Sequence, residues 1–421
     1  MTNLCPSSKH PIDQDERVLY VSYDGMLEPL GQSQVLAYLK QLSASRTMHL
    51  ISYEKRADWA DAVRRQGTQR ELAACGVHWH PLRYHKSPST LATAWDIMIG
   101  TGLGLFLVMR HRLFIVHARS YVAAVIALVL KLVTGARFIF DMRGLWADER
   151  VDGGLWRREA RIFRVAKWFE RQFLSHADHV VSLTHAGEQE LRRFPYLARR
   201  SPAITVIPTC ADLDRFRPLP SIPREFALGY VGSAGTWYDF DAAVACFAAM
   251  RAADPTARFL IVNRGEHDYI RDRLAAAGLP LSCVELRSAS HEDMPSQMSR
   301  IRAGVFFVKP VYSKQASAPT KLGELLGCGI PCLSNQGVGD MARILEEDRV
   351  GVAVASFERS AIDEGLQRLL RLLQERDIGL RCRDAAQRRF ALEEGVARYA
   401  AVYRSVSASL HQNRRIHERQ P

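Results

Sequence analysis

A short segment in the second half of the chain carries side chains suited to a phosphorylated ligand. Pro319 favours the first turn of a helix and Gly329 its carboxyl end, which predicts a helix over 319–328. The unpaired amides and the dipole at the start of a helix attract phosphate, and a lysine there adds a full positive charge. The side chains expected at this amino end are those of Ser317, Thr320 and Lys321.

Glu324 follows Lys321 by one helical turn and has two interpretations. It could form an i,i+3 ion pair with Lys321 on a solvated face, which stabilises a helix by only tenths of a kcal/mol. Its carboxylate could instead accept hydrogen bonds from two hydroxyls of a ribose. The spacing alone is compatible with both.

A second candidate is the glycine-rich turn after a predicted strand over 226–231. Gly232 and Gly235 permit a close approach of the backbone to a ligand, and the helix predicted beyond Thr236 favours a phosphate. An ordinary glycine turn explains the same residues equally well. Further cations near the predicted strand ends are Arg264, Lys309 and Lys314.

These loops belong to two series of apolar runs that alternate with helical patterns. Nearly continuous apolar strands separated by helices predict parallel sheets that are covered on both faces. The first series has strands at 17–22, 48–53, 77–82, 113–117, 137–141, 179–183 and 203–207, and helices at 33–45, 57–74, 90–110, 121–134, 156–176 and 186–194. The second has strands at 226–231, 259–262, 283–286, 305–308, 331–334 and 351–355, with helices that include 239–252, 319–328 and 337–345, and a last helix at 392–410.

A proline-rich stretch around 214–224 separates the two series and is the predicted linker. We expect a disordered tail over 1–16, a Rossmann-like acceptor domain over 17–219 and a Rossmann-like donor domain over 220–390. A final helix and tail over 391–421 would pack back on the first domain. Ligands of such sheets bind outside the carboxyl ends of the strands, so the loops after the strands are where chemistry is expected.

The composition is that of a globular protein with an anionic partner. The 421 residues suffice for two domains, 47% of them are hydrophobic, and the net charge is +12. Eight scattered cysteines without a CxxC pair argue against a disulfide or zinc framework and favour a reducing cytosol. The most apolar stretch, 97–109, is shorter than the roughly 20 residues of a spanning helix. We therefore expect no membrane span, but a buried helix or a membrane-surface contact.

The segment 156–173 mixes six arginines and lysines with apolar and aromatic residues. A solvated face of a packed helix is the ordinary interpretation. A basic amphipathic helix on an anionic membrane is the alternative, since each basic residue near such a surface contributes about 1 kcal/mol. No nucleic-acid recognition motif accompanies these residues, so we expect no nucleic-acid partner.

Several longer motifs follow one another in a specific order. They are Tyr23-Asp24-Gly25-Met26, Pro29 to Gln34, His117-Ala118-Arg119-Ser120, Asp141-Met142-Arg143-Gly144, Val206 to Asp212, Ser317 to Glu324, Gly329 to Pro331 and Asn335 to Asp340. Together they resemble glycosyltransferase family 4, the retaining enzymes of the GT-B fold, and within it the branch that builds bacterial surface polysaccharides. The resemblance covers the chain from about Val18 to Phe390.

The resemblance implies roles for individual residues. In that family the glutamate at the position of Glu324 binds the donor ribose, and the helix start at Thr320–Lys321 faces the diphosphate. The loop matching Gly31 approaches the donor phosphates or the acceptor, and the histidine matching His117 lies near the reacting centre.

Three positions keep an alternative interpretation. His117 could be a hydrogen-bonded core histidine at a strand end. Asp141 and Arg143 also end a strand at the predicted cleft, where they could contact the acceptor or form a buried ion pair.

Two departures from the family pattern concern the sugar and the diphosphate. The first glutamate of the family's pair, which contacts the transferred sugar, is replaced by Ala316. The arginine and lysine that hold the diphosphate are replaced by Ser233, Ala234 and Trp237. Sugar contact must then use other groups, such as amides near Ser317. The phosphate charge must be met by Lys321 first, or by Lys309, Lys314 or Arg264.

Two Asp-x-Asp strings, at 212–214 and 239–241, resemble metal-binding pairs of other glycosyltransferases. The first follows the hinge motif, and the second opens a helix, where acidic residues are favoured in any case. We therefore expect no metal and no cofactor, with the nucleotide diphosphate sugar as co-substrate.

The sequence thus predicts an α/β protein of the GT-B fold with two facing Rossmann-like domains. The expected activity is retaining, metal-independent hexosyl transfer from a nucleotide diphosphate sugar to a lipid-linked saccharide, by a cytoplasmic protein peripheral to the inner face of the plasma membrane. Alternatives are an epimerase or phosphorylase of the same fold and an inactive GT-B scaffold subunit. The predicted catalytic residues are His117, Lys321 and Glu324; the donor site adds Gly31, Gly232, Gly235, Thr236, Arg264, Ser317 and Thr320; the acceptor site has Asp141 and Arg143.

Overall fold

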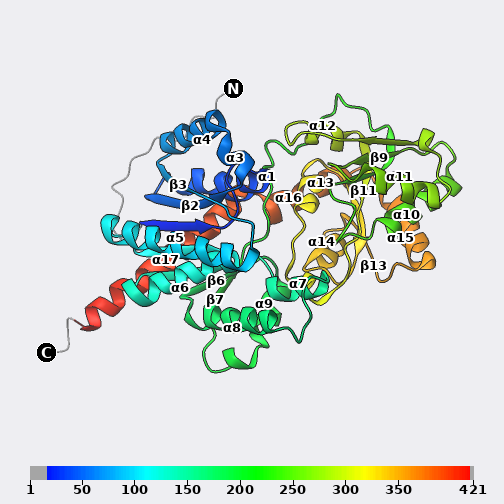
Figure 1. Ribbon diagram of the computed structural model, residues 1–421. Helices are drawn as coiled ribbons and strands as arrows, with labels where there is room; N and C mark the ends of the chain where they lie inside the picture. The colour runs from blue at the N-terminus through cyan, green and yellow to red at the C-terminus, as the bar shows by residue number, and fades with distance from the viewer. Residues whose placement is uncertain (1–16, 418–421) are drawn as a thin grey trace.

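The computed structural model describes residues 17–417, which form two parallel sheets, each covered by helices on both faces (Figure 1). The predicted tail over 1–16 lies outside the described residues. Apolar side chains on both faces of the central strands account for this arrangement, because these strands must be covered on both sides. The predicted α/β fold with two Rossmann-like sheets is therefore confirmed.

The first sheet contains seven parallel strands in the order β3-β2-β1-β4-β5-β6-β7. Its centre is fully buried: β1 carries no exposed residue, and it pairs with β2 on one side and β4 on the other. The strands are β1 (Val18–Ser22), β2 (Met48–Glu54), β3 (Val77–Arg83), β4 (Ile115–Arg119), β5 (Arg137–Asp141), β6 (His179–Ser182) and β7 (Ala203–Val206).

Two groups of helices cover this sheet. The core on one face joins side chains of α5, α6 and α8, and the core on the other joins those of α2, α4 and α17. The helices are α1 (Pro29–Gly31), a π-helical turn (Gln32–Leu36), α2 (Ala37–Leu42), α3 (Arg56–Ala60), α4 (Ala62–Ala74), α5 (Ser89–His111), α6 (Ser120–Thr134), α7 (Trp146–Asp152), α8 (Arg161–His176) and α9 (His185–Arg192).

The second sheet has six parallel strands in the order β10-β9-β8-β11-β12-β13. Its strands are β8 (Phe226–Val231), β9 (Phe259–Val262), β10 (Val284–Arg287), β11 (Ile301–Val305), β12 (Cys332–Asn335) and β13 (Gly351–Val354). Its helices are α10 (Phe240–Ala253), α11 (His267–Ala276), α12 (Met294–Ser299), α13 (Thr320–Gly327), α14 (Met341–Glu347), α15 (Arg359–Leu372) and α16 (Ile378–Phe390).

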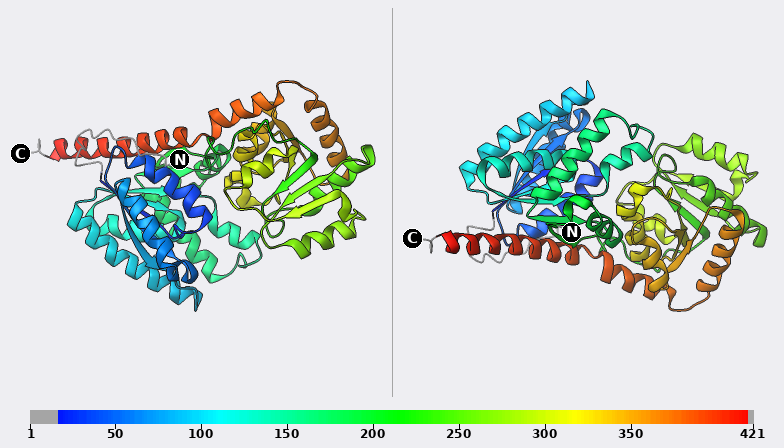
Figure 2. Two further views of the ribbon diagram at one scale, coloured as in Figure 1. Left: turned by 90° about the horizontal axis from the view of Figure 1, so that it is seen from above. Right: turned by 90° about the horizontal axis from the view of Figure 1, so that it is seen from below.

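The last helix, α17 (Leu392–His417), returns to the first sheet, as predicted (Figure 2). The chain crosses back beside the segment that first left the domain, since Ala211 N donates to Phe390 O at 2.8 Å. Tyr399, Tyr403 and Val406 of α17 are then buried against α2 and the first sheet. Both Rossmann-like units are therefore joined by two adjacent crossings.

Several predicted elements have the wrong bounds. The helix expected at 57–74 is two helices, α3 and α4, and the helix expected at 337–345 is α14, which begins only at Met341. The strand expected at 305–308 is β11, which begins at Ile301 and ends at Val305. Beyond its end, Val308 N donates to the side-chain oxygen of Asn335 and not to a strand of the sheet. The strand expected at 113–117 runs two residues further, to Arg119. The helix expected from residue 156 begins only at Arg161, after a turn.

Helix α5 is longer than the apolar stretch at 97–109 indicated. It spans 23 residues, and within 17–417 it is the one helix long and apolar enough to cross a membrane, with 33% of its apolar window buried. Gly100 and Gly104 let it pack closely, since a Cβ atom at Gly100 would lie 2.0 Å from the Tyr53 hydroxyl. The expectation that the chain does not span a membrane stays a prediction.

Candidate functional site

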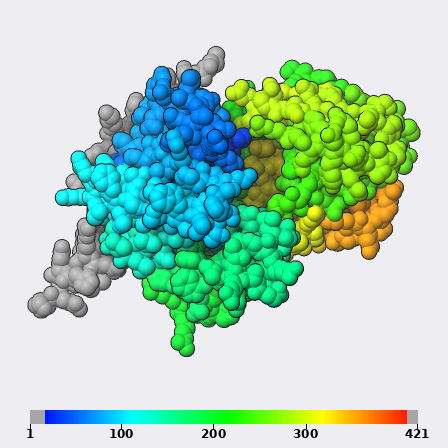
Figure 3. Space-filling model, viewed as in Figure 1, coloured from blue at the N-terminus to red at the C-terminus, as the bar shows by residue number. Residues whose placement is uncertain are grey.

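The candidate site lies where the order of the second sheet reverses, between β8 and β11. The strands that follow β8 in sequence lie on one side of it and those that follow β11 on the other, which is where doubly wound sheets bind ligands. The loops after these two strands face the first domain across a hollow (Figure 3). Helix α13 begins at this edge, and no side chain caps its first amides.

Lys321, in the first turn of α13, is buried and points its ammonium group into a set of aromatic rings. Its Nζ lies 3.7 Å from the ring centre of Tyr238, 5.2 Å from Tyr230 and 5.4 Å from Phe306. It has no hydrogen-bond partner in the part of the chain that the structure describes. Burial lowers the pKa of Lys321 to about 7, although Glu324 and Glu266 act to raise it.

Glu324 lies one turn further along α13, and its side chain is half-buried. Burial raises the pKa of its carboxyl group to about 7, against the opposing effect of Lys321. The described residues offer its carboxylate neither a hydrogen bond nor an ion pair within 4 Å, so the simple i,i+3 salt pair is not formed. A buried ammonium without a partner, beside a half-buried carboxylate without one, is costly in free energy, and such perturbed groups gather at functional sites.

The hydrogen-bond donors of the glycine-rich turn already bind a carboxylate of the protein, that of Glu266. The Glu266 carboxylate accepts hydrogen bonds from Ala234 N at 2.8 Å, Gly235 N at 2.9 Å and the Ser233 hydroxyl at 2.9 Å. Asn263 Nδ2 donates to it at 2.8 Å. A donor phosphate could use the Gly235 amide only if Glu266 moved away, and the donor role of Gly232 and Gly235 stays a prediction.

Sequence reasoning missed Glu266. Its position in the sequence could have indicated this contact, because it follows β9, the neighbour of β8, three residues after Asn263. Thr236, at the end of the same turn, has a φ of 52° without being glycine. Such left-handed positions are strained and cluster at ligand-binding loops.

The other predicted cations differ in availability. Arg264 and Lys309 follow β9 and β11, the two neighbours of β8, and their side chains are exposed with no partner among the described residues. Lys314 is buried between the domains instead. Its Nζ lies 2.6 Å from the Glu149 carboxylate of α7 and 3.8 Å from the ring centre of Trp237, so its charge is already compensated.

Ala316, which replaces the family's first glutamate, packs on the first domain. It is 5% exposed and belongs to the core that covers the first sheet. Its Cβ lies 3.0 Å from where a Cβ of Gly187 in α9 would be. A glutamate side chain has no room at this position in the observed arrangement of the domains, which gives a physical reason for the alanine.

Ser317 and the residues before it form a polar contact zone between the domains. Tyr312 Oη donates to Glu190, Ser313 N to Asp152, and Thr184 Oγ1 to Gln315 O. From the loop before α14, the Asp340 carboxylate accepts hydrogen bonds from His185 N and Ala186 N at the start of α9. These contacts hold the loop before α13 in place.

His117 is 1% exposed and lies under α17, not at the hollow. Its Nδ1 lies 2.7 Å from the Tyr403 hydroxyl, and its Nε2 lies 3.7 Å from Asp141 Oδ2. Burial lowers its pKa, although Asp141 acts to raise it. The structure does not bring His117 together with Lys321 and Glu324, and its role near the reacting centre stays a prediction.

Asp141 is fully buried among positive and polar groups. Arg143, Arg119 and His117 lie within 4 Å of it, and Tyr399 Oη donates to it at 2.9 Å. Burial acts to raise its pKa, but the neighbouring cations hold the pKa at about 2. Asp141 and Arg143 thus form the buried ion pair that the sequence left open, and their acceptor role stays a prediction.

Gly31 is required by its own loop. A Cβ atom there would lie 2.1 Å from Gly25 O, so only glycine allows α1 to fold back on the loop after β1. The buried Glu54 carboxylate accepts hydrogen bonds from Met26 N and Leu27 N and fixes the same loop. Its proximity to a donor or acceptor stays a prediction.

The two Asp-x-Asp strings have local structural partners. Asp212 accepts a hydrogen bond from Arg215 N, Asp239 caps α10 through Ala242 N, and Asp241 pairs with Arg273. No group of three or more metal-binding side chains occurs within residues 17–417.

Comparisons with known proteins agree with this architecture. Residues 34–210 match the model of the glycosyl transferase 4-like domain. No curated protein is similar enough in sequence to count as a relative.

Solved structures resemble the whole chain at low sequence identity. Sucrose-phosphate synthase from Thermosynechococcus elongatus has a TM-score of 0.69 at 15% identity, covering 93% of this chain and 99% of its own. A glycosyltransferase from Rickettsia africae has a TM-score of 0.68 at 14% identity, covering 92% and 98%. HepE from Anabaena, solved with UDP, has a TM-score of 0.62 at 14% identity, covering 92% and 100%.

These likenesses cover more than nine tenths of the chain and hence both Rossmann-like units. The first unit, from the π-helical turn to the crossing at Cys210, carries the match to the family model. The chain therefore contains a glycosyl transferase 4-like domain over residues 34–210, and as a whole it has the GT-B fold.

Proposed function

We propose that the protein transfers a sugar from a nucleotide diphosphate sugar to a hydroxyl group, with the donor held at the amino end of α13. The observation that carries this proposal is the pair Lys321, which is buried, and Glu324, which is half-buried, both without partners beside a turn that faces the hollow. A ribose supplies two hydroxyls for the carboxylate, and a diphosphate supplies negative charge for the ammonium. One ligand thereby satisfies both groups.

The ligands of a solved structure with the same fold also support this class of donor. HepE, which shares the fold, was solved with UDP and with UDP-glucose. In this chain the leaving diphosphate would meet the uncapped amides of α13, with Lys321 below them and Arg264 and Lys309 at the neighbouring strand ends. These charges make a metal unnecessary, and we expect transfer to continue in excess chelator.

Retention of the anomeric configuration is part of the proposal and rests on the family resemblance. A front-face path, in which the incoming hydroxyl approaches on the side of the leaving phosphate, needs no nucleophile from the protein. The protein then contributes to catalysis by orienting the donor and by stabilising negative charge on the departing phosphate.

A lipid-linked saccharide at an anionic membrane is the proposed acceptor. Helix α8 and the turn before it expose basic and apolar side chains together, and α5 exposes an apolar stripe with helical spacing. The exposed residues are Leu155, Arg157, Arg158, Arg161, Ile162, Arg164, Val165, Trp168 and Arg171 near α8, and Leu91, Trp95, Met98, Phe106 and Met109 on α5. Both helices cover the same face of the first sheet.

Sedimentation with vesicles tests the membrane part. Anionic vesicles should bind the protein and neutral ones should bind it less, because exposed charges act over about 8 Å at physiological salt and about 3 Å at 1 M. Release at 1 M salt indicates that α8 dominates, and binding that resists salt indicates that α5 dominates. Equal failure to bind both kinds of vesicle rejects a membrane-bound acceptor.

Donor titration of Glu324→Gln tests the central proposal. Loss of a charged acceptor for two hydroxyls should weaken the binding of the preferred nucleotide diphosphate sugar about 100-fold. Glu364→Gln, on the exposed side of α15, is the matched control and should bind donor as the wild type does. Equal donor affinity of Glu324→Gln and the control would reject the ribose role.

An inactive GT-B scaffold subunit is the second candidate. It is favoured by Ala316, which removes the family's sugar contact, and by Glu266, which occupies the amides of the glycine-rich turn. Release of sugar from the donor by purified protein, with or without an acceptor, supports the enzyme. Donor binding without any turnover supports the scaffold.

A further inference from the structure

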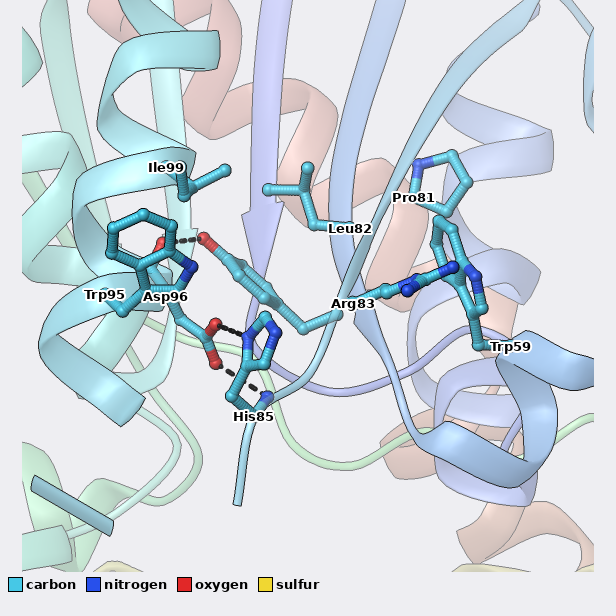
Figure 4. A pocket seen from close by; sticks show the side chains of 9 residues that line it. Trp59, Pro81, Leu82, Arg83, His85, Trp95, Asp96 and Ile99 are labelled. Atoms are coloured by element: carbon cyan, nitrogen blue, oxygen red, sulfur yellow. Dashed lines mark hydrogen bonds and ion pairs between the residues drawn. The ribbon is translucent and has the colours of Figure 1, made fainter. Parts of the chain in front are cut away.

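A pocket of about 300 Å³ opens at the carboxyl ends of β2 and β3, outside every site considered above (Figure 4). Its lining comes from the carboxyl ends of these two strands, the loop after β3, α3 and the first half of α5. The floor is apolar, with Leu82 and Ile99 side by side. A volume of this size is in the range of small-ligand sites.

Two opposite walls of the pocket carry flat groups. Trp95 of α5 stands on one side and is 51% exposed. On the other side Arg83 lies over Trp59, with its Cζ 5.0 Å from the ring centre. The guanidinium group has no acceptor among the described residues, so its N–H donors remain free while the stacking fixes its plane.

The polar end of the pocket is built around Asp96, which is 1% exposed. Its carboxylate accepts hydrogen bonds from the Tyr23 hydroxyl at 2.8 Å and from His85 N at 3.1 Å, and it lies 2.6 Å from His85 Nδ1. A carboxylate on Nδ1 fixes that nitrogen as the donor, and in the tautomer that carries its one proton there Nε2 is an acceptor. His85 is 46% exposed, so this acceptor is accessible.

These groups suit one class of ligand. A sugar ring has an apolar face of C–H groups, which packs on an aromatic ring, and a rim of hydroxyls, which both donate and accept hydrogen bonds. Trp95 provides the ring, Arg83 provides donors and His85 Nε2 provides an acceptor. A phosphate would lack a partner for the aromatic wall, and an aliphatic chain would lack partners for Arg83 and His85.

The position of the pocket agrees with an acceptor. It lies at the same edge of the first sheet as the loop after β1, and Tyr23 of that loop donates to Asp96. Neighbouring strands are about 4.8 Å apart, so the pocket lies roughly 10 Å from the point between β1 and β4 where this sheet reverses its order. Trp95 also belongs to the exposed apolar stripe of α5. A sugar in the pocket therefore has an apolar surface beside it.

We propose that this pocket binds a sugar unit of the acceptor, whose lipid part lies along the apolar stripe of α5. The proposal rests on the proposed transferase function and names the acceptor site within it. Trp95 is the stacking residue, Arg83 and His85 bind hydroxyls, and Asp96 is a positioning residue that acts through His85.

Ligand-observed NMR with a panel of n-octyl glycosides, below their micelle concentrations, tests the proposal. Saturation transfer should reach the sugar ring and the octyl chain of at least one member. Trp95→Ala and Arg83→Gln should each weaken its binding about tenfold. Leu281→Ala is the matched control, because this side chain is 54% exposed before β10 of the second sheet, away from the pocket and from the exposed faces of α5 and α8.

The outcomes separate this inference from the proposed function. Donor titration of the same variants should give the wild-type affinity, since none of the three residues lies at α13. Absence of donor binding by the wild type overturns the proposed function. If the donor binds normally, the pocket alone is overturned when no glycoside binds, or when Trp95→Ala and Leu281→Ala bind it equally well.

Discussion

Both sheets of this protein bury charged groups at their carboxyl ends, but the two clusters are compensated very differently. In the first domain, Asp141 has two arginines and His117 within 4 Å and a hydrogen bond from Tyr399. In the second, Lys321 is buried and Glu324 half-buried, with no side-chain hydrogen bond or ion pair inside the described part of the chain.

This difference distinguishes a charge cluster that stabilises the fold from one that is available to a ligand. A buried charge with nearby counter-charges is already stabilised and is costly to disturb, so its removal destabilises the fold. A buried charge without partners destabilises the empty protein and is stabilised when a ligand supplies them. The clusters are alike in residue type, and the missing partners distinguish the candidate site.

The replacement Asp141→Asn should give the largest effect on stability. It removes the carboxylate that Arg119 and Arg143 share and leaves Arg119 with Asp24 alone, which should lower the free energy of unfolding by about 3 kcal/mol. Glu324→Gln removes an uncompensated charge and should leave stability at neutral pH unchanged or increased. Denaturant unfolding of both variants at pH 7 measures the contrast, and an equal loss in the two variants would remove the distinction between the clusters.

The second prediction concerns the pH dependence of the free energy of unfolding, and it reports on the Glu324 carboxyl group alone. Its folded pKa of about 7 lies above the ordinary value of 4.5, so the folded state holds the proton more tightly between these values. Stability contributed by this group is therefore full below pH 4.5 and is lost as pH rises to 7, by about 2 kcal/mol. The difference in unfolding free energy between wild type and Glu324→Gln should change by this amount from pH 5 to pH 7.

Asp141 provides the control for that measurement. Its folded pKa of about 2 lies below the ordinary value of 3.8, so its contribution is present above pH 3.8 and is lost only as pH falls towards 2. The difference between wild type and Asp141→Asn should therefore stay constant from pH 5 to pH 7. A flat profile for both variants would show that Glu324 is ionised in the folded protein.

The smallest expected effect comes from Tyr403→Phe. It removes the hydroxyl that meets His117 Nδ1 at 2.7 Å, at a cost of about 1 kcal/mol in stability. Donor affinity and the transfer rate should remain those of the wild type, because His117 lies under α17. A transfer rate that falls tenfold at unchanged donor affinity would instead support the catalytic role predicted for His117.

The sequence predicted the fold through local signals. Continuous apolar runs such as those of β1 and β8 identify buried parallel strands without tertiary information, and Pro319 and Gly329 bracket α13 closely. The errors arise where a distant side chain replaces the local pattern. At β11, Asn335 takes over the hydrogen bonds of Val308, 27 residues away, so the apolar run continues beyond the strand.

The candidate site was predictable in residue type but not in surroundings. The position of Lys321 and Glu324 at a helix start follows from spacing, whereas the aromatic rings around Lys321 come from three other segments. Glu266 reaches the glycine-rich turn from 31 and 32 residues away. The environment of His117 depends on Tyr403, 286 positions later. The periodicity of apolar residues along the chain gives no information on such contacts between distant segments.

This last separation has a consequence for how the protein is made. A ribosome adding about 5–20 residues per second reaches Tyr403 roughly 15–60 s after His117. Until then the face of the first sheet that α17 covers remains open, and the charges around Asp141 stay hydrated. The domain synthesised first is thus completed last, and a chain that stops before α17 keeps an exposed apolar face that chaperones and proteases can recognise.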